Sequence, residues 1–242
     1  MGIALVTGAS SGIGLSVAQK LVGMDYTVYG FARDFTETAF QHERFKPVVC
    51  DVTDRLTLEE RTNAVLKESG SLDVLVNNAG VGFFGPHETI SAAKLEQMVL
   101  TNLLAPMMLT RLVLRNLRDA HGFVINIAST AALNPGRFGC AYTATKAGLH
   151  QFGLSLFDEV RKSGVKVVTL YPDMTRTRFY DEADFEPHDD PDCHLTPECV
   201  ANAVEQVLSQ REGTVITQMV IRPQRVEVKK KNRRTADGRS GG

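Results

Sequence analysis

The sequence contains no tryptophan and little cysteine, and both the number and the spacing of its thiols are informative. The four cysteines are Cys50, Cys140, Cys193 and Cys199. This spacing matches no disulfide framework, so we expect free thiols in a reducing, cytoplasmic compartment. Met1 is followed almost at once by the apolar run Ile3–Val6, which leaves no room for a signal peptide and favours the same location.

Metal-binding spacing is also missing. His188, Cys193, His194 and Cys199 lie close together in the sequence, but they match no common zinc pattern. The residues around them are otherwise acidic. We therefore expect this segment to be a loop and the protein to bind no metal.

Neither sign of charge dominates the whole chain. The 27 lysines and arginines are set against 28 aspartates and glutamates, a formal net charge of −1. Residues 229–242 hold three lysines and three arginines against one aspartate, which is +5, so residues 1–228 sum to −6. We expect one domain over residues 1–228, a disordered basic tail over 229–242, and no nucleic-acid partner. A nucleic-acid or membrane-surface arm is the alternative for the tail, and its binding would have to be salt-sensitive.

Long uninterrupted hydrophobic runs are absent. The most apolar long stretch, Val99–Leu114, is interrupted by Thr101, Asn102, Pro106 and Arg111. Such a stretch is typical of a buried helix rather than of a membrane span, so we expect no membrane partner. The proline should kink or break this helix.

Short apolar runs alternate with helical patterns along the whole chain. The runs cover residues 3–6, 27–32, 45–51, 72–77, 123–127, 165–170 and 214–221. This alternation predicts an α/β fold, a three-layer doubly wound parallel sheet of the Rossmann-like type. It should have about seven strands, with helices on both faces.

A glycine-rich turn follows the first predicted strand and opens a helix. Glycines in this context let a pyrophosphate approach the helix N-terminus, whose free N–H groups favour anions. The predicted contacts are Gly8, Ser10, Ser11, Gly12, Ile13 and Gly14. The glycine spacing is G-x-x-x-G-x-G rather than G-x-G-x-x-G, and a tight turn without a ligand is the alternative.

The end of the second predicted strand bears on the choice of cofactor. In dinucleotide folds this position faces the adenosine ribose, where an acidic side chain would repel a 2′-phosphate. The chain has Ala32 followed by Arg33. This pair favours NADP(H), with NAD(H) still possible. Two further predicted strands end in residues expected to contact the cofactor: Asp51, Val52, Asn78, Ala79 and Gly80.

A group of polar residues between positions 102 and 146 suggests acid–base chemistry. Tyr142 and Lys146 are four residues apart and would share one helix face. A nearby ammonium favours the phenolate, so we expect Lys146 to lower the pKa of Tyr142. Ser129, at a strand end, could present its hydroxyl to the same reacting oxygen. Asn102 lies among leucines, and a buried amide needs partners, in a structural bridge or in a polar site.

These motifs occur together in the order found in the short-chain dehydrogenase/reductase family, which the sequence resembles over residues 3–221. The resemblance implies an NAD(P)-dependent oxidoreductase that interconverts carbonyls and alcohols. It makes Tyr142 the general acid and base, Lys146 its partner and a ribose ligand, and Ser129 the holder of the substrate oxygen. Asn102 would support a water relay.

The resemblance also implies Pro172, Thr175 and Thr177 as cofactor contacts, and a homo-oligomer, most simply a tetramer. One departure is Asp173, because the family usually has glycine there. The candidate lining of an apolar or aromatic carbonyl pocket is Phe83, Phe84, Leu133, Phe138, Phe179, Tyr180 and Phe185. An acyl-carrier-dependent 3-ketoacyl reductase and a non-catalytic dinucleotide sensor are the alternative functions.

Overall fold

Seven parallel strands form the centre of the fold in the computed structural model, which describes residues 2–231. Their order in the sheet is β3-β2-β1-β4-β5-β6-β8, and every neighbouring pair is parallel. The strands are β1 Gly2–Thr7, β2 Tyr26–Ala32, β3 Phe45–Val49, β4 Val74–Asn77, β5 Phe123–Ile127, β6 Lys166–Pro172 and β8 Gln218–Ile221. The expected doubly wound sheet is confirmed. The direction of winding changes between β1 and β4, and such sheets bind ligands there, beyond the carboxyl ends of the strands.

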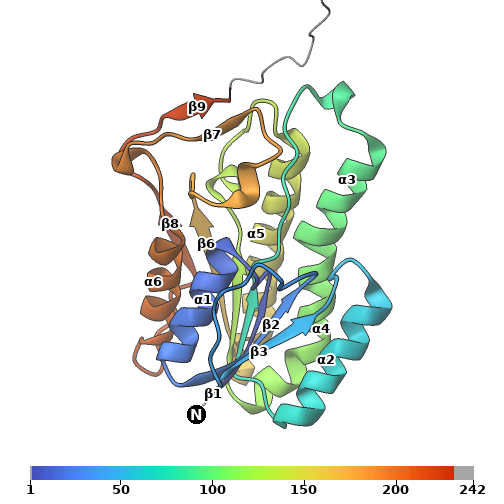
Figure 1. Cartoon of the computed structure of the whole chain (residues 1–242). Helices are drawn as coiled ribbons and strands as arrows, with labels where there is room; N and C mark the ends of the chain where they lie inside the picture. Colours follow the sequence, from blue (N-terminus) through green and yellow to red (C-terminus); the bar gives the residue numbers. More distant parts are fainter. Residues whose placement is uncertain (1, 232–242) are drawn as a thin grey trace, which may run out of the picture.

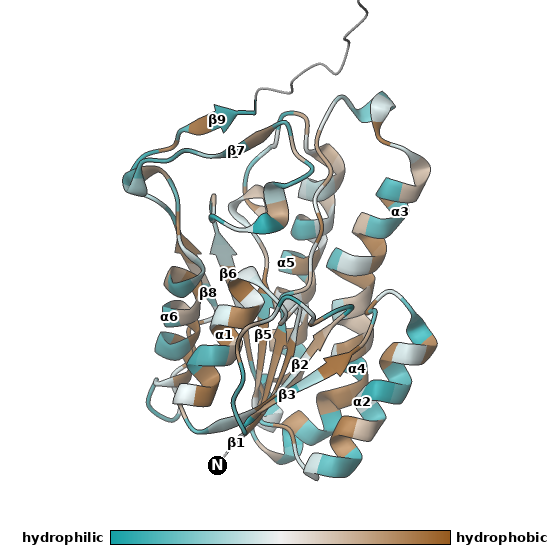
Figure 2. Cartoon of the chain, in the orientation of Figure 1, coloured by the Kyte–Doolittle hydropathy of each residue, from teal (hydrophilic) through white to brown (hydrophobic). Residues whose placement is uncertain are grey.

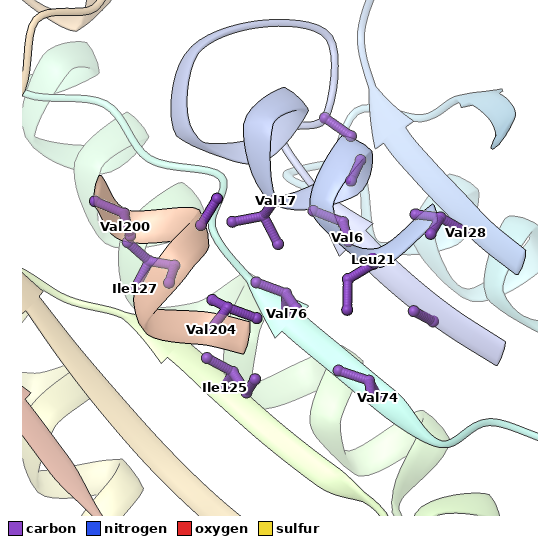
Figure 3. Packing of buried hydrophobic residues seen from close by; sticks show 14 of the residues in the cluster. Val6, Val17, Leu21, Val28, Val74, Val76, Ile125, Ile127, Val200 and Val204 are labelled. Carbon is purple, nitrogen blue, oxygen red and sulfur yellow. The ribbon is translucent and has the colours of Figure 1, made fainter. Parts of the chain in front are cut away.

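Helices cover both faces of the sheet (Figure 1). Those that pack on it are α1 Gly12–Gly23, α2 Arg55–Ser69, α4 Ala105–Asp119, α5 Cys140–Val160 and α6 Pro197–Leu208. Helices α1 and α6 bury apolar side chains against one face, and Figure 3 shows Val17, Leu21, Val200 and Val204 meeting strand residues there. Helices α2, α4 and α5 cover the other face. Figure 2 shows apolar strands between helices whose outer sides are polar.

The long helical pattern after Ser91 contains an irregularity that the sequence does not reveal. Helix α3, Ala92–Val99, passes into one π-helical turn, Leu100–Leu104, and then into α4. Pro106 lies in the first turn of α4, where a missing N–H is tolerated. Single π-turns are often found at functional sites, and this one contains Asn102.

The stretch Ala92–Asp119 is long and apolar enough to cross a membrane by length and composition alone. Of its most apolar window, 44% is buried inside the protein. Core helices of globular proteins pass the same test, so this finding is weak evidence for a membrane span.

A second, two-stranded sheet corrects two expectations. The strands β7 Phe185–Pro187 and β9 Val228–Lys230 pair antiparallel, and they lie beyond the carboxyl ends of the main sheet (Figure 1). The segment around His188 is therefore not simply a loop. The prediction of disorder from residue 229 onward is wrong for Lys229–Lys231, and the remainder of that tail lies outside the described residues.

Candidate active site

The predicted acid–base residues meet at the carboxyl end of β5 and the start of α5. The Ser129 hydroxyl and the Tyr142 phenol are hydrogen-bonded, and the Ser129 oxygen also accepts the N–H of Ala131 at 3.2 Å. The Lys146 ammonium lies 5.9 Å from the centre of the Tyr142 ring and donates to the carbonyl oxygen of Ile127 at 2.9 Å. The buried side chains of Tyr142 and Lys146 thus meet the half-buried Ser129 in one site.

The expected lowering of the Tyr142 pKa is not what this structure shows. Burial raises the pKa of Tyr142 to about 12, and the bond from Ser129 opposes this only in part. Burial also lowers the pKa of Lys146 to about 8. Both effects have the same cause, since a low-dielectric surrounding disfavours whichever form is charged. The phenol is accordingly a protonated donor at neutral pH.

Aromatic rings account for the burial of Tyr142. Phe84 lies 5.4 Å from its ring centre and Phe179 lies 5.6 Å away. Phe185 is 5.2 Å from Phe84, and Tyr180 is 5.1 Å from Phe179. Four members of the predicted pocket lining therefore gather around the phenol. We call these four side chains, together with Tyr142, the aromatic group.

The other three members have different surroundings, and their place in the lining stays a prediction. Phe83 is under the ammonium of Lys94, at 4.7 Å. Leu133 and Phe138 are 41% and 51% exposed. Phe138 also has a φ of 61°, which is unusual for a bulky residue.

Asn102 is completely buried and its side-chain amide is fully used. Its oxygen accepts the N–H of Val81 at 2.8 Å, while its NH₂ group donates to the Val81 carbonyl at 2.8 Å and to Thr145 Oγ1 at 3.1 Å. The amide therefore bridges the π-turn, the segment after β4 and α5. Of the two expected roles, the contacts support the structural bridge.

The glycine turn has the geometry expected of a dinucleotide cradle. Gly8 and Gly12 have φ values of 67° and 54°, which only glycine adopts easily. A Cβ on Gly14 would lie 2.1 Å from the Gly8 carbonyl oxygen, so the turn closes tightly on α1. Ser11 precedes α1 without a side-chain cap, which leaves the N–H groups of the first turn available to an anion. Ile13, between the glycines, packs its side chain against the core.

Residues at the neighbouring strand ends hold this turn in place. Thr7 Oγ1 accepts the backbone N–H groups of Asn78 and Ala79, each at 3.0 Å, and Asn78 Nδ2 donates to the Thr7 carbonyl at 2.8 Å. The predicted contact Asn78 thus joins β1 to β4 with its side chain. Gly80 brings the backbone near Lys146, because a Cβ there would lie 3.5 Å from its Nζ.

Asp51 and Val52 lie beyond the end of β3 and are partly buried. The Asp51 carboxylate accepts both the N–H and the hydroxyl of Thr53, at 2.9 and 2.7 Å. These bonds fix the chain at the edge of the crevice where an adenine would be expected.

Arg33 extends from the end of β2 into solvent. Within residues 2–231 its guanidinium forms no ion pair or hydrogen bond. The adjacent Asp34 carboxylate turns away to accept the N–H and hydroxyl of Thr36, both at 2.8 Å. Among the described residues Arg33 thus has no ionic partner, and the carboxylate of Asp34 is bound to Thr36.

The carboxyl end of β6 tolerates the replacement of the usual glycine. Positive φ values among the described non-glycine residues occur only at Asp25, His121 and Phe138, so Asp173 adopts ordinary backbone geometry. Pro172 ends β6, and Thr175 is buried with its hydroxyl donating to the Asp173 carbonyl at 2.9 Å.

Thr177 contacts the glycine turn directly. A Cβ on Gly12 would lie 3.2 Å from Thr177 Cγ2. The Thr177 hydroxyl accepts the N–H of Phe179 at 3.3 Å and begins a short 3₁₀ helix, Arg178–Tyr180. The segment that contributes Phe179 to the aromatic group therefore starts beside the cofactor crevice.

Comparison with known proteins agrees with this geometry. The family model described as short chain dehydrogenase matches residues 2–186. The chain belongs to the short-chain dehydrogenase family. It is therefore an oxidoreductase that depends on a nicotinamide dinucleotide.

Two relatives and one solved structure illustrate this membership. An uncharacterised oxidoreductase of Staphylococcus epidermidis is 30% identical over 226 residues, covering 91% of this chain and 96% of the relative. Serine 3-dehydrogenase of Agrobacterium fabrum is 32% identical over 183 residues, covering 74% of each protein. An alcohol dehydrogenase of Thermococcus sibiricus complexed with 5-hydroxy-NADP superposes with a TM-score of 0.85 at 26% identity, covering 94% of this chain and 99% of that one.

This short-chain dehydrogenase also uses residues that the sequence did not single out. Thr7 orders the strand end through the bonds described above. Thr145 receives the Asn102 amide and donates its own hydroxyl to the Tyr142 carbonyl at 2.8 Å. The position of Thr7 directly before the first glycine of the turn could have indicated its role. Nothing in the local sequence distinguishes Thr145 from other helical threonines.

Proposed function

We propose that this protein is an NADP(H)-dependent reductase that interconverts a carbonyl and a secondary alcohol, with Tyr142 as general acid and base. The observation that carries the proposal is the meeting of Ser129, Tyr142 and Lys146 at the end of β5 and the start of α5. Because burial raises the pKa of Tyr142, the phenol carries its proton at neutral pH and can give it to the more basic alkoxide that forms during reduction.

Ser129, Tyr142 and Lys146 would each have a separate role in the reaction. Ser129 donates a hydrogen bond to the carbonyl oxygen, and Tyr142 transfers its phenolic proton to that oxygen as it becomes an alkoxide. Lys146 gives one hydrogen to Ile127 and has two more for the cofactor ribose. The nicotinamide, when bound, supplies or accepts the hydride.

The substrate class follows from the aromatic group. Phe84 and Phe179 flank the phenol, so a carbonyl reaching Tyr142 must pass between aromatic faces. This surrounding favours an apolar or aromatic carbonyl of moderate size. A panel of such carbonyls, followed by nicotinamide absorbance with NADPH and NADH separately, tests the function. Turnover of apolar ketones is expected; cofactor binding without turnover of any carbonyl would favour the dinucleotide sensor.

The preference for NADP(H) depends on Arg33. Its unpaired guanidinium can meet the 2′-phosphate, and the serines of the glycine turn offer hydroxyl donors nearby. The Thermococcus sibiricus relative, solved with 5-hydroxy-NADP, supports this choice. A hydrogen bond to a charged group contributes about 1.5–3 kcal/mol, so Arg33→Ala should weaken NADPH by roughly ten- to a hundredfold and leave NADH nearly unchanged.

The test is kcat/KM for both cofactors at fixed ionic strength, because salt screens such contacts. Arg211→Ala, another exposed arginine, is the matched control and should change neither value. Ala32→Asp should reverse the preference by repelling the phosphate. Equal weakening of both cofactors in Arg33→Ala would show that Arg33 does not recognise the phosphate.

A further inference from the structure

A second group of reactive side chains gathers beside the small β7–β9 sheet. His188 directly follows β7, Cys193 ends the 3₁₀ turn Pro191–Cys193, and Glu227 directly precedes β9. One ligand atom of each residue lies within 4.8 Å of the others, and His188 Nε2 is 4.0 Å from Glu227 Oε2. Two chain segments that are distant in the sequence thus bring a nitrogen, a sulfur and an oxygen together.

The Cys193 thiol lacks the partner that a buried polar group normally has. Its side chain is completely buried, and within residues 2–231 no hydrogen bond to Sγ and no disulfide is present. Its sulfur lies within 4.8 Å of a ligand atom of His188 and of Glu227, so the thiol faces two other ligand atoms.

Contacts around the cluster hold its two segments together without a metal. Arg225 pairs with Asp190 and lies 3.7 Å from Asp192, so it joins the C-terminal segment to the turn. The Asp190 carboxylate caps this turn by accepting the N–H of Asp192 at 2.9 Å. His194 Nδ1 lies 2.9 Å from the His188 carbonyl and 3.0 Å from that of Asp190. The three ligand atoms are thus positioned in advance.

We propose that His188, Cys193 and Glu227 bind a divalent transition metal, with Zn²⁺ as the best-suited ion. Zinc accepts imidazole nitrogen, thiolate sulfur and carboxylate oxygen at about 2.0–2.3 Å, whereas Ca²⁺ and Mg²⁺ require mainly oxygen. Three protein ligands leave a fourth position for water. The positive charge of Arg225 is offset by its two aspartates.

Binding has a defined proton balance. The Cys193 S–H bond breaks, the sulfur–metal bond forms, and one proton leaves to the solvent. In His188, Nδ1 now accepts the N–H of Asp190 at 3.2 Å, which leaves the ring proton on Nε2. Coordination through Nε2 moves that proton to Nδ1, so the long hydrogen bond from Asp190 is broken.

The metal would connect the segment that covers Tyr142 to the C-terminal strand. Phe185 of β7 packs on Phe84, which packs on Tyr142. A metal held by His188 after β7 and by Glu227 before β9 would therefore restrict the motion of Phe185 and of the rings that pack on it. The metal site does not depend on the proposed reaction.

The experiment uses full-length protein without a histidine tag, reduced and freed of metal, and titrated with Co²⁺. A thiolate-to-cobalt charge-transfer band and tetrahedral d–d bands should appear at one ion per chain, and Zn²⁺ should remove them. Zn²⁺ binding in weak buffer should release about one proton per chain. Cys193→Ser should abolish the charge-transfer band, whereas Cys199→Ser, the matched control, should keep it.

Glu227→Gln is the second variant, because Glu227 is exposed and its replacement should not disturb folding. It should weaken Zn²⁺ by roughly ten- to a hundredfold or more, as loss of a metal partner does. The proposal is overturned if wild type shows no charge-transfer band, if both cysteine variants lose it alike, or if Glu227→Gln binds Zn²⁺ as tightly as wild type.

Discussion

At the scale of single residues, burial shifts the pKa values of Tyr142 and Lys146 in opposite directions. The phenol is held in its protonated form and the ammonium is pushed toward neutrality. The first shift keeps the proton on the phenol, which is the form in which the proposed reduction begins. The second places the loss of the Lys146 charge near the pH range in which enzymes are assayed.

The Lys146 shift makes stability depend on pH in a predictable direction. Because its folded pKa of about 8 lies below its ordinary 10.5, the unfolded chain binds more protons between these values. The free energy of unfolding should therefore gain from this group as pH rises through that window, by about 3 kcal/mol at full deprotonation.

Denaturant titrations of cofactor-free protein between pH 7.5 and about 9 measure the effect, with Lys146→Met as the comparison. The range stops there because Cys50 and Tyr142, whose pKa values are raised, contribute with the opposite sign at higher pH. The difference between wild type and variant should grow in favour of wild type with pH. A constant difference would show that Lys146 keeps an ordinary pKa.

The candidate site illustrates how far residues can be predicted from sequence. Local spacing placed Tyr142 one turn from Lys146, and the end of a strand placed Ser129. The raised pKa of Tyr142 could not be predicted, since it depends on Phe84 and Phe179, which come from segments 58 and 37 residues away in the sequence. Long-range packing thus reversed the direction of the Tyr142 pKa shift that local spacing had suggested.

At the scale of elements, we propose that residues 178–195, which contribute Phe179, Tyr180 and Phe185 to the rings around Tyr142, form a cover over the phenol; we call them the cover segment. Arg178 pairs with Glu37 of the segment after β2, and Lys229 pairs with Asp189 at 2.9 Å and with Glu186 at 3.5 Å. Exposed ion pairs of this kind contribute little individually. We therefore expect the cover segment to be held weakly enough to open for a substrate.

Limited proteolysis tests this opening. We expect the first cut to fall in the cover segment, and NADP(H) together with a carbonyl product should slow it. Arg178→Ala, which frees Glu37, should speed the cut several-fold in the free protein, while Arg211→Ala should not. Equal cleavage rates with and without ligands would remove the evidence for a moving cover.

The regular elements were largely predictable, and the short ones were not. The five inner strands of the main sheet, β1, β2, β4, β5 and β6, showed as apolar runs between turn residues, because both of their sides are buried. Strands β7 and β9 are three residues each, and one consists of Val228, Lys229 and Lys230, without an apolar pattern. The π-turn around Asn102 could not be predicted either, because one extra residue in a helical turn does not change the amino-acid composition of the helix.

At the scale of the whole molecule, the long helix leaves apolar side chains uncovered. Val99, Leu104 and Met107 are 47%, 41% and 37% exposed. Gly148 of α5 lies close to Leu103, so α5 approaches the π-turn tightly. Exposed apolar side chains of this size are typical of contact surfaces.

We therefore expect a homo-oligomer, most simply a tetramer, that buries the helix from Ala92 to Asp119. Sedimentation velocity at micromolar concentration should give a mass well above the 26.5 kDa of one chain. Leu104→Lys together with Met107→Lys should shift the distribution toward the monomer, because charges are costly to bury at an interface. A wild-type mass of one chain would contradict the expected assembly.

The most direct test of the central claim is single-turnover reduction by Tyr142→Phe, which keeps the ring and removes only the proton donor. NADPH affinity should stay within about twofold of wild type, while the rate of ketone reduction should fall by about 10²–10⁴-fold, the usual contribution of a general acid. Tyr180→Phe, which changes the other phenol of the aromatic group, serves as the matched control and should retain most activity. Near wild-type reduction by Tyr142→Phe, with NADPH still bound, would contradict the assignment of Tyr142 as the acid.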